Sequence, residues 1–184
     1  MKPVIDGGAR QPKSCSTSGR ECAAVTDPDP DHRAKALVAE GCEHEHALDW
    51  QAAIGCYREA VIAKALDPRV RYFAHNNLGY SLIQLHCFDE AAGYCEAAID
   101  INPEQYNAHK NLGLAHEGRG RWLEAALSLA QAAWLCPQNT RAWLHLQKLL
   151  EHKPELPGQS PELALAVAEV QAIYEKNGVL PRLN

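Results

Sequence analysis

The sequence contains no apolar run approaching the roughly 18–20 residues that span a bilayer. No apolar core follows the lysine in the opening stretch MKPVIDGGARQPKS, so a secretory signal is not expected. Basic residues are also few, with 18 Lys and Arg against 23 Asp and Glu and a net charge of −5. Because phosphates bind basic faces, this charge argues against nucleic acid. These absences predict a cytoplasmic protein that binds neither membrane nor nucleic acid.

Catalytic signatures are missing as well. The sequence has no phosphate loop, no dinucleotide fingerprint and no GxSxG. Its seven cysteines and nine histidines show neither CxxC nor HExxH spacing, the patterns typical of zinc sites. An odd number of cysteines without a framework spacing is typical of free thiols in a reducing compartment. We therefore expect no enzyme, no cofactor and no metal ion.

The sequence does contain a repeat: residues 106–139 match residues 72–105 at fixed positions. Each matched pair is separated by 34 residues. A strict period of this length indicates helical hairpins that stack and share one core. The matched pairs are Asn77/Asn111, Leu78/Leu112, Gly79/Gly113, Phe88/Trp122, Glu90/Glu124, Ala91/Ala125, Ala98/Ala132 and Pro103/Pro137.

The matched residue types predict how the hairpins pack. Small residues such as Gly79, Ala91 and Ala98 fall where helices have to approach closely, and a larger side chain there would force them apart. The aromatic residue Phe88 fills the wedge at the start of the second helix. Pro103 cannot continue a helix and marks the turn into the next repeat.

An earlier, degenerate repeat precedes these two. Its small and aromatic residues keep the same mutual spacings, and they are Gly41, Trp50, Ala53 and Ala60. Pro68 follows Ala60 by eight residues, whereas Pro103 follows Ala98 by five. We therefore expect the second helix of this first repeat to be about one turn longer.

The ends of the repeat region carry helix signals. Asp29 can cap a helix that begins at Pro30, and Ser160 followed by Pro161 opens a last helix that ends at Asn177 and Gly178. Terminal repeats commonly cap a solenoid. The expected organisation is a disordered tail over 1–30, a helical domain over 31–177 and a tail over 178–184. Within the domain we expect repeats at about 34–71, 72–105 and 106–139 and a capping helix pair at 140–177.

The 34-residue repeat and its matched residues resemble the tetratricopeptide repeat family, and the resemblance covers residues 31–177. The resemblance implies an all-α, right-handed α-solenoid of helix–turn–helix repeats, with about eight helices and no strand. It also implies a non-enzymatic protein–protein interaction module. Such a module would act as an adaptor, scaffold or co-chaperone and would bind a peptide segment of another protein in its concave groove.

In this family the first helices of successive repeats line the groove. By resemblance, the groove face here comprises Asn76, Asn77, Tyr80, Gln84, Asn107, Lys110, Asn111, Leu114, Glu117, Arg141, Leu144, His145 and Lys148. The recurring Asn77 and Asn111 form a ladder that could pair with a peptide backbone, because a carboxamide both donates and accepts. The alternative is that each asparagine bonds to a helix end or to a neighbouring repeat.

Some family members bind acidic chaperone tails through a two-carboxylate clamp built from Lys, Asn, Asn, Lys and Arg. The corresponding positions here are Val38, Cys42, Asn77, Asn107 and Asn111, or one repeat later Asn76, Tyr80, Asn111, Arg141 and His145. Asn77 alone fits the first register, and Asn111 and loosely Arg141 fit the second. Because the cationic pair that forms charge-assisted bonds is missing, we do not expect that clamp.

Two other functions stay open. The protein could be a structural one that self-associates through its groove. It could also be a metal- or redox-responsive regulator that uses Cys42, His44 and His46, or the tail cysteines Cys15 and Cys22. Cys42 and His46 lie one helical turn apart. The repeated histidines His75 and His109 are interpreted as structural, and the sequence predicts neither the partner nor the oligomeric state.

Overall fold

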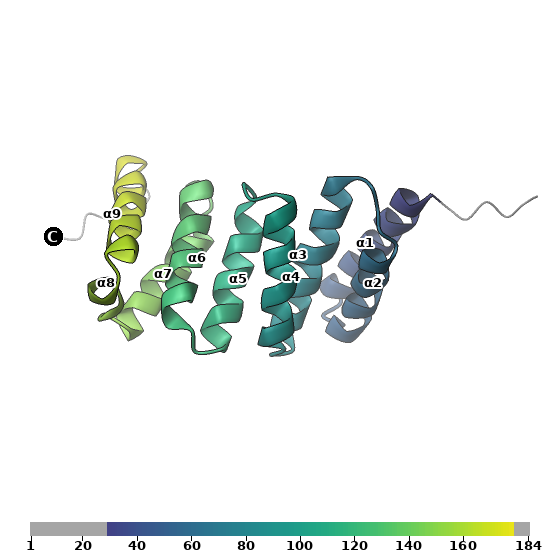
Figure 1. The fold of residues 1–184 in the computed structure, drawn as a ribbon, viewed down its shortest axis with the longest axis horizontal. Coiled ribbons are helices and arrows are strands. Elements are labelled where there is room, and N and C mark those ends of the chain that lie inside the picture. The colour runs from purple at the N-terminus through teal and green to yellow at the C-terminus, as the bar shows by residue number, and fades with distance from the viewer. Residues whose placement is uncertain (1–28, 179–184) are drawn as a thin grey trace, which may run out of the picture.

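The computed structural model describes residues 29–178, which form nine α-helices and no strand within that range (Figure 1). The prediction of an all-α solenoid is confirmed. About eight helices were expected, and the additional one is the four-residue α8, which lies in the connection before the last long helix. The helices are α1 (Pro30–His46), α2 (Trp50–Ile62), α3 (Pro68–Gln84), α4 (Phe88–Ile101), α5 (Tyr106–Gly118), α6 (Trp122–Leu135), α7 (Thr140–His152), α8 (Leu156–Gln159) and α9 (Pro161–Lys176).

The helices follow one another in chain order along the long axis of the molecule (Figure 1). Consecutive helices pack in antiparallel pairs, α1 with α2, α3 with α4 and α5 with α6, and each pair packs against the next. No helix within residues 29–178 combines the length and the apolarity needed to cross a membrane. The expected tails lie outside this range, apart from Asp29 and Pro30 at one end and Gly178 at the other.

Short polar side chains cap several helices at the positions that the sequence indicates. Asp29 accepts a hydrogen bond from the backbone N–H of Asp31, and Pro30 begins α1. The Ser160 hydroxyl accepts one from the N–H of Leu163 at 3.2 Å and begins α9 in the same way. Each cap satisfies an N–H that has no partner inside its own helix.

Close approach of helices recurs once in each repeat. A methyl group added to Gly41 would lie 2.5 Å from the ring of Tyr57, one added to Gly79 would lie 2.6 Å from Sγ of Cys95, and one added to Gly113 would lie 2.7 Å from Leu129. In each case the residue that the methyl group would meet belongs to the second helix of the same hairpin and follows its glycine by 16 residues. The period in the sequence therefore corresponds to a repeated packing contact.

The buried alanines share this geometry. Ala91, Ala98, Ala125 and Ala132 are fully inaccessible to solvent. The wedge predicted for Phe88 is formed against the next hairpin, because its ring lies on Gly118, where a methyl group would be 2.4 Å from the ring.

The extra turn of helix lies in α3, so the expectation of a longer second helix in the first repeat is wrong. α2 has 13 residues, whereas α3 has 17 against 13 in the equivalent α5. α2 ends because Lys64 adopts the left-handed conformation, with φ of 51°. Asp67 then caps a new helix that begins at Pro68. The Asp31 carboxylate fixes this turn by accepting from the backbone N–H groups of Leu66 and Asp67.

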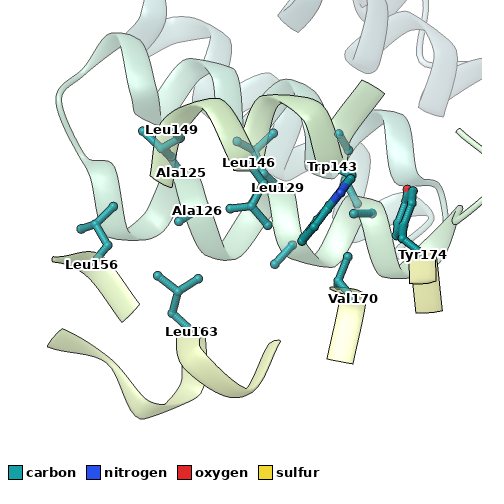
Figure 2. Packing of buried hydrophobic residues seen from close by; sticks show 14 residues of the cluster. Ala125, Ala126, Leu129, Trp143, Leu146, Leu149, Leu156, Leu163, Val170 and Tyr174 are labelled. Atoms are coloured by element: carbon teal, nitrogen blue, oxygen red, sulfur yellow. The ribbon is translucent and has the colours of Figure 1, made fainter. Parts of the chain in front are cut away.

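The C-terminal end is closed by a hydrophobic cluster that joins α6, α7, α8 and α9 (Figure 2). The rings of Trp143 and Tyr174 stack with centroids 5.4 Å apart. Leu163 and Val170 of α9 are fully buried beside them. This burial of apolar surface holds the last helix on the solenoid.

Candidate functional site

A hollow of about 290 Å³ lies across the first helices of three consecutive hairpins, α3, α5 and α7. We call it the central hollow. Seven of the residues expected in the groove line it, and they are Asn76, Asn77, Tyr80, Asn107, Lys110, Asn111 and Arg141. The 34-residue period brings them together because equivalent positions on stacked hairpins face the same side.

The asparagines of the central hollow form a hydrogen-bonded chain. The Nδ2 of Asn111 donates to Oδ1 of Asn76 at 3.1 Å, and the Nδ2 of Asn76 donates to Oδ1 of Asn77 at 3.0 Å. The Nδ2 of Asn77 then donates to Sγ of Cys42 and to the hydroxyl of Tyr57. This chain links α5 to α3, and α3 to the first hairpin.

The asparagines that line the central hollow differ in burial. Asn76 and Asn111 are only 7% and 2% exposed, whereas Asn77 and Asn107 are half-buried. The Nδ2 groups of Asn77 and Asn111 each donate to a neighbouring repeat, which agrees with the alternative given for these asparagines. Pairing of the Asn77 and Asn111 ladder with a peptide backbone stays a prediction.

Two cations line the hollow, Lys110 and Arg141. The pKa of Lys110 is lowered, mainly by burial and then by the neighbouring charge of Arg141. The Lys110 ammonium lies 5.8 Å from the centre of the Tyr80 ring, which stabilises a cation on its face. No carboxylate forms an ion pair with either cation within residues 29–178.

Lys110 takes the place that Asn76 holds one repeat earlier, 34 residues before it. In the second of the two clamp registers, Asn76 stands at the place of the first lysine, and Lys110 is its equivalent one repeat later. Neither register includes Lys110 together with Arg141, although both residues are expected on the groove face. The structure brings these two cations into one hollow.

A second hollow, of about 380 Å³, lies between the C-terminal ends of α5 and α7. Its lining residues are Glu117, Trp122, Lys148, Leu149, His152 and Lys153. The Lys153 ammonium lies 5.1 Å from the centre of the Trp122 ring. Of the expected groove residues, Lys148 and Glu117 belong here. Sequence reasoning assigned Trp122 to packing alone, yet its side chain is 36% exposed.

The remaining expected groove residues line neither hollow. Leu114 is half-buried and packs against a second hydrophobic cluster, which joins α2, α3, α4 and α5, and Gln84 is also half-buried. Leu144 and His145 are exposed on α7.

The contacts of Cys42 do not favour the alternative of a metal site shared with His44 and His46. The Sγ of Cys42 accepts a hydrogen bond from the hydroxyl of Tyr57 at 3.4 Å, so it faces α2 and α3 rather than a shared ion with His46. His75 and His109 bond to backbone carbonyl oxygens, which fits their structural interpretation. Cys15 and Cys22 lie outside the described residues.

The sequence matches a model of the tetratricopeptide repeat over residues 38–104 and again over 76–140. It is 28% identical over 129 residues to the small glutamine-rich tetratricopeptide repeat-containing protein 2 of Saccharomyces cerevisiae, covering 68% of this chain and 36% of that protein. It is 34% identical over 87 residues to the cell division cycle protein 27 homolog of Caenorhabditis elegans, covering 47% of this chain and 10% of that protein. The chain thus spans little more than a third of these relatives, or less.

Solved structures show the same fold. The tetratricopeptide domain of Arabidopsis OM64 superposes with a TM-score of 0.62 at 24% identity, covering 67% of this chain and 98% of that one. The first such domain of Spaghetti (RPAP3), bound to an HSP90 peptide, gives 0.61 at 22% identity, covering 67% and 95%. The two matches to the family model together span residues 38–140, more than half of the chain. The chain therefore belongs to the tetratricopeptide repeat family.

Proposed function

We propose that this protein is a non-enzymatic adaptor, of the co-chaperone or scaffold kind, that holds an acidic peptide segment of another protein in its central hollow. A ligand carboxylate lies between Lys110 and Arg141, and the half-buried Asn77 and Asn107 contact the peptide backbone. Members of this family bind other proteins. What we propose for this protein is that the ligand is a peptide segment, that it is acidic and that it lies in the central hollow.

The proposal rests on one observation: Lys110 and Arg141 lie in the same hollow, and neither forms an ion pair with a carboxylate of residues 29–178. Lys110 is partly desolvated beside Arg141, and the hollow has no acidic lining residue. Two like charges in a partly buried site repel each other, and an anionic ligand relieves that repulsion. Charge-assisted hydrogen bonds to a carboxylate are also about twice as strong as neutral ones.

Two solved structures of the same fold support an acidic ligand. The first tetratricopeptide domain of RPAP3 was solved with the HSP90 peptide SRMEEVD, and the second with the HSP70 peptide SGPTIEEVD. Both peptides end in Glu-Glu-Val-Asp, so three of their last four residues are acidic. The lysine and arginine positions of the known clamp are not reproduced here, so the proposed carboxylate site uses Lys110 in their place.

The test is the affinity of fluorescein-labelled SRMEEVD for the full chain, measured by anisotropy. Lys110→Met removes the charge and keeps an unbranched side chain, and Arg141→Gln removes the second cation. Because a hydrogen bond to a charged group contributes about 1.5–3 kcal/mol, each change should weaken binding about tenfold or more. A peptide with both glutamates replaced by glutamine should lose a similar amount.

Lys176→Met is the matched control, because this lysine is exposed in the last turn of α9, away from the hollow. It should leave the affinity unchanged. The proposal is wrong if SRMEEVD does not bind, or if the glutamine peptide and Lys110→Met bind as tightly as the originals.

The proposal also places the protein in the cytoplasm. The cysteines within residues 29–178 are all free thiols, namely Cys42, Cys56, Cys87, Cys95 and Cys136. Free thiols persist in a reducing compartment.

A further inference from the structure

We propose that Glu40, His44 and Cys56 form a binding site for one zinc ion, which joins α1 to α2 in the first hairpin. Each residue offers one ligand atom, and these three atoms all lie within 4.8 Å of one another. This site is separate from the central hollow, whose lining residues belong to α3, α5 and α7.

The site arises from helical geometry. Glu40 and His44 are four residues apart on α1, so they lie one turn apart on the same face. Cys56 comes from the middle of α2, which packs against α1. Residues at i and i+4 on one helix and one from its neighbour converge on a single point between the two helices.

The donor set suits zinc. A carboxylate oxygen, an imidazole nitrogen and a thiolate sulfur are its three common protein ligands, and three of them leave a fourth tetrahedral position for water. Thiolate favours zinc over calcium or magnesium, which prefer oxygen ligands. Glu40 is exposed and the other two are half-buried, so an ion can enter from solvent.

None of the three side chains forms an ion pair with another residue of the range 29–178. Cys56 also lies near the carboxylates of Glu40 and Glu59. Both negative charges would attract a divalent cation to this point.

Cys42 provides an internal comparison. It lies two residues from His44, yet its Sγ is already bonded to the Tyr57 hydroxyl and to Asn77 on the opposite side of α1. The structure therefore assigns His44 to a different cysteine from the one that its position in the sequence suggests.

The test uses Co²⁺ as a probe, because a cobalt–thiolate bond gives a charge-transfer band in the near ultraviolet. The full-length reduced protein should develop this band with one equivalent of Co²⁺ and lose it when Zn²⁺ is added. Cys56→Ser should abolish the band. His44→Gln and Glu40→Gln should each weaken Zn²⁺ binding at least about tenfold, since even outer-sphere changes cost about 10–100-fold.

Cys42→Ser is the matched control, and Cys15→Ser with Cys22→Ser is the second. Both should keep the band and the affinity for Zn²⁺, and circular dichroism should show the same helix content in every variant. The proposal is overturned if the wild-type protein gives no thiolate band, if the band survives in Cys56→Ser, or if either control abolishes it.

Discussion

The Nδ2 of Asn111 in α5 donates to the Oδ1 of Asn76 in α3 at a distance of 3.1 Å, across the floor of the central hollow. Both residues are almost completely buried. A buried carboxamide oxygen that loses its donor keeps its desolvation cost. The floor of the ligand site is therefore also a structural contact between consecutive repeats, and it is separable from the rim that contacts a ligand.

Asn111→Ala should lower the free energy of unfolding by about 1–3 kcal/mol, because it leaves the Oδ1 of Asn76 buried without its donor. Urea denaturation followed by circular dichroism measures this. Asn107→Ala is the control, since Asn107 lines the same hollow and is half-buried. It should change stability by less than about 0.5 kcal/mol. Equal losses in the two variants would contradict the separation of floor and rim.

Ala125→Leu should destabilise the fold by about 1–3 kcal/mol, because Ala125 is fully buried where α6 packs on α5 and the site has no room for three more carbons. Thermal melting measures the effect. Ala39→Leu places the same side chain on an exposed face of α1 and should leave the melting temperature nearly unchanged. A stable Ala125→Leu variant would mean that the register of the repeats is wrong.

The turns inside the hairpins predict a pair of opposite effects. Leu48, His86 and Gly120 occupy equivalent turn positions with φ of 60°, 60° and 71°. L-residues are strained in this left-handed region and glycine is not. Gly120→Ala should lower stability by about 1 kcal/mol, and Leu48→Gly, at a side chain 70% exposed, should raise it by a similar amount. Changes of the same sign in chemical denaturation would refute the argument.

Glu45 predicts a pH dependence of stability. Burial raises its pKa, and the hydrogen bond from the Ser81 hydroxyl, at 2.9 Å, only partly opposes this. Folding therefore disfavours the ionised form. Stability is lost as the pH rises from the ordinary glutamate pKa through the raised folded value, and the loss is complete above that folded value.

Glu45→Gln removes this loss while keeping an oxygen that can accept from Ser81. The variant should melt at a higher temperature than the wild type at pH 7, and the difference should disappear below about pH 4.5, the ordinary value for glutamate. A difference that does not change with pH would show that ionisation of Glu45 is not its cause.

The period of the sequence predicts the architecture because each repeat makes the same local contact. Gly79 and Cys95 recur as Gly113 and Leu129, so the closest approach within each hairpin follows from the spacing alone. The position of the extra turn could not be predicted in this way. Pro68 is compatible with a longer helix before it or after it, and the bonds from Leu66 and Asp67 to Asp31 join residues 35 and 36 positions apart.

The central hollow could be predicted from the family's groove, but the burial and the hydrogen bonds of its lining residues could not. Asn111 and Asn107 look alike in sequence, yet one is buried and bonded to Asn76 and the other is half-buried. The cation pair of Lys110 and Arg141 depends on how α5 and α7 stack. The same holds for His44, whose neighbours in space are Glu40 and Cys56 rather than Cys42.

Amide chemical-shift changes in ¹⁵N-labelled protein on addition of SRMEEVD test the central claim most directly, because they locate the ligand without a mutation. Binding in the central hollow predicts that the largest changes fall on its rim, at Asn77, Tyr80, Asn107, Lys110 and Arg141. Changes concentrated instead on exposed positions of the second helices, such as Gly93 of α4 and Gln131 of α6, would contradict it, as would the absence of any change.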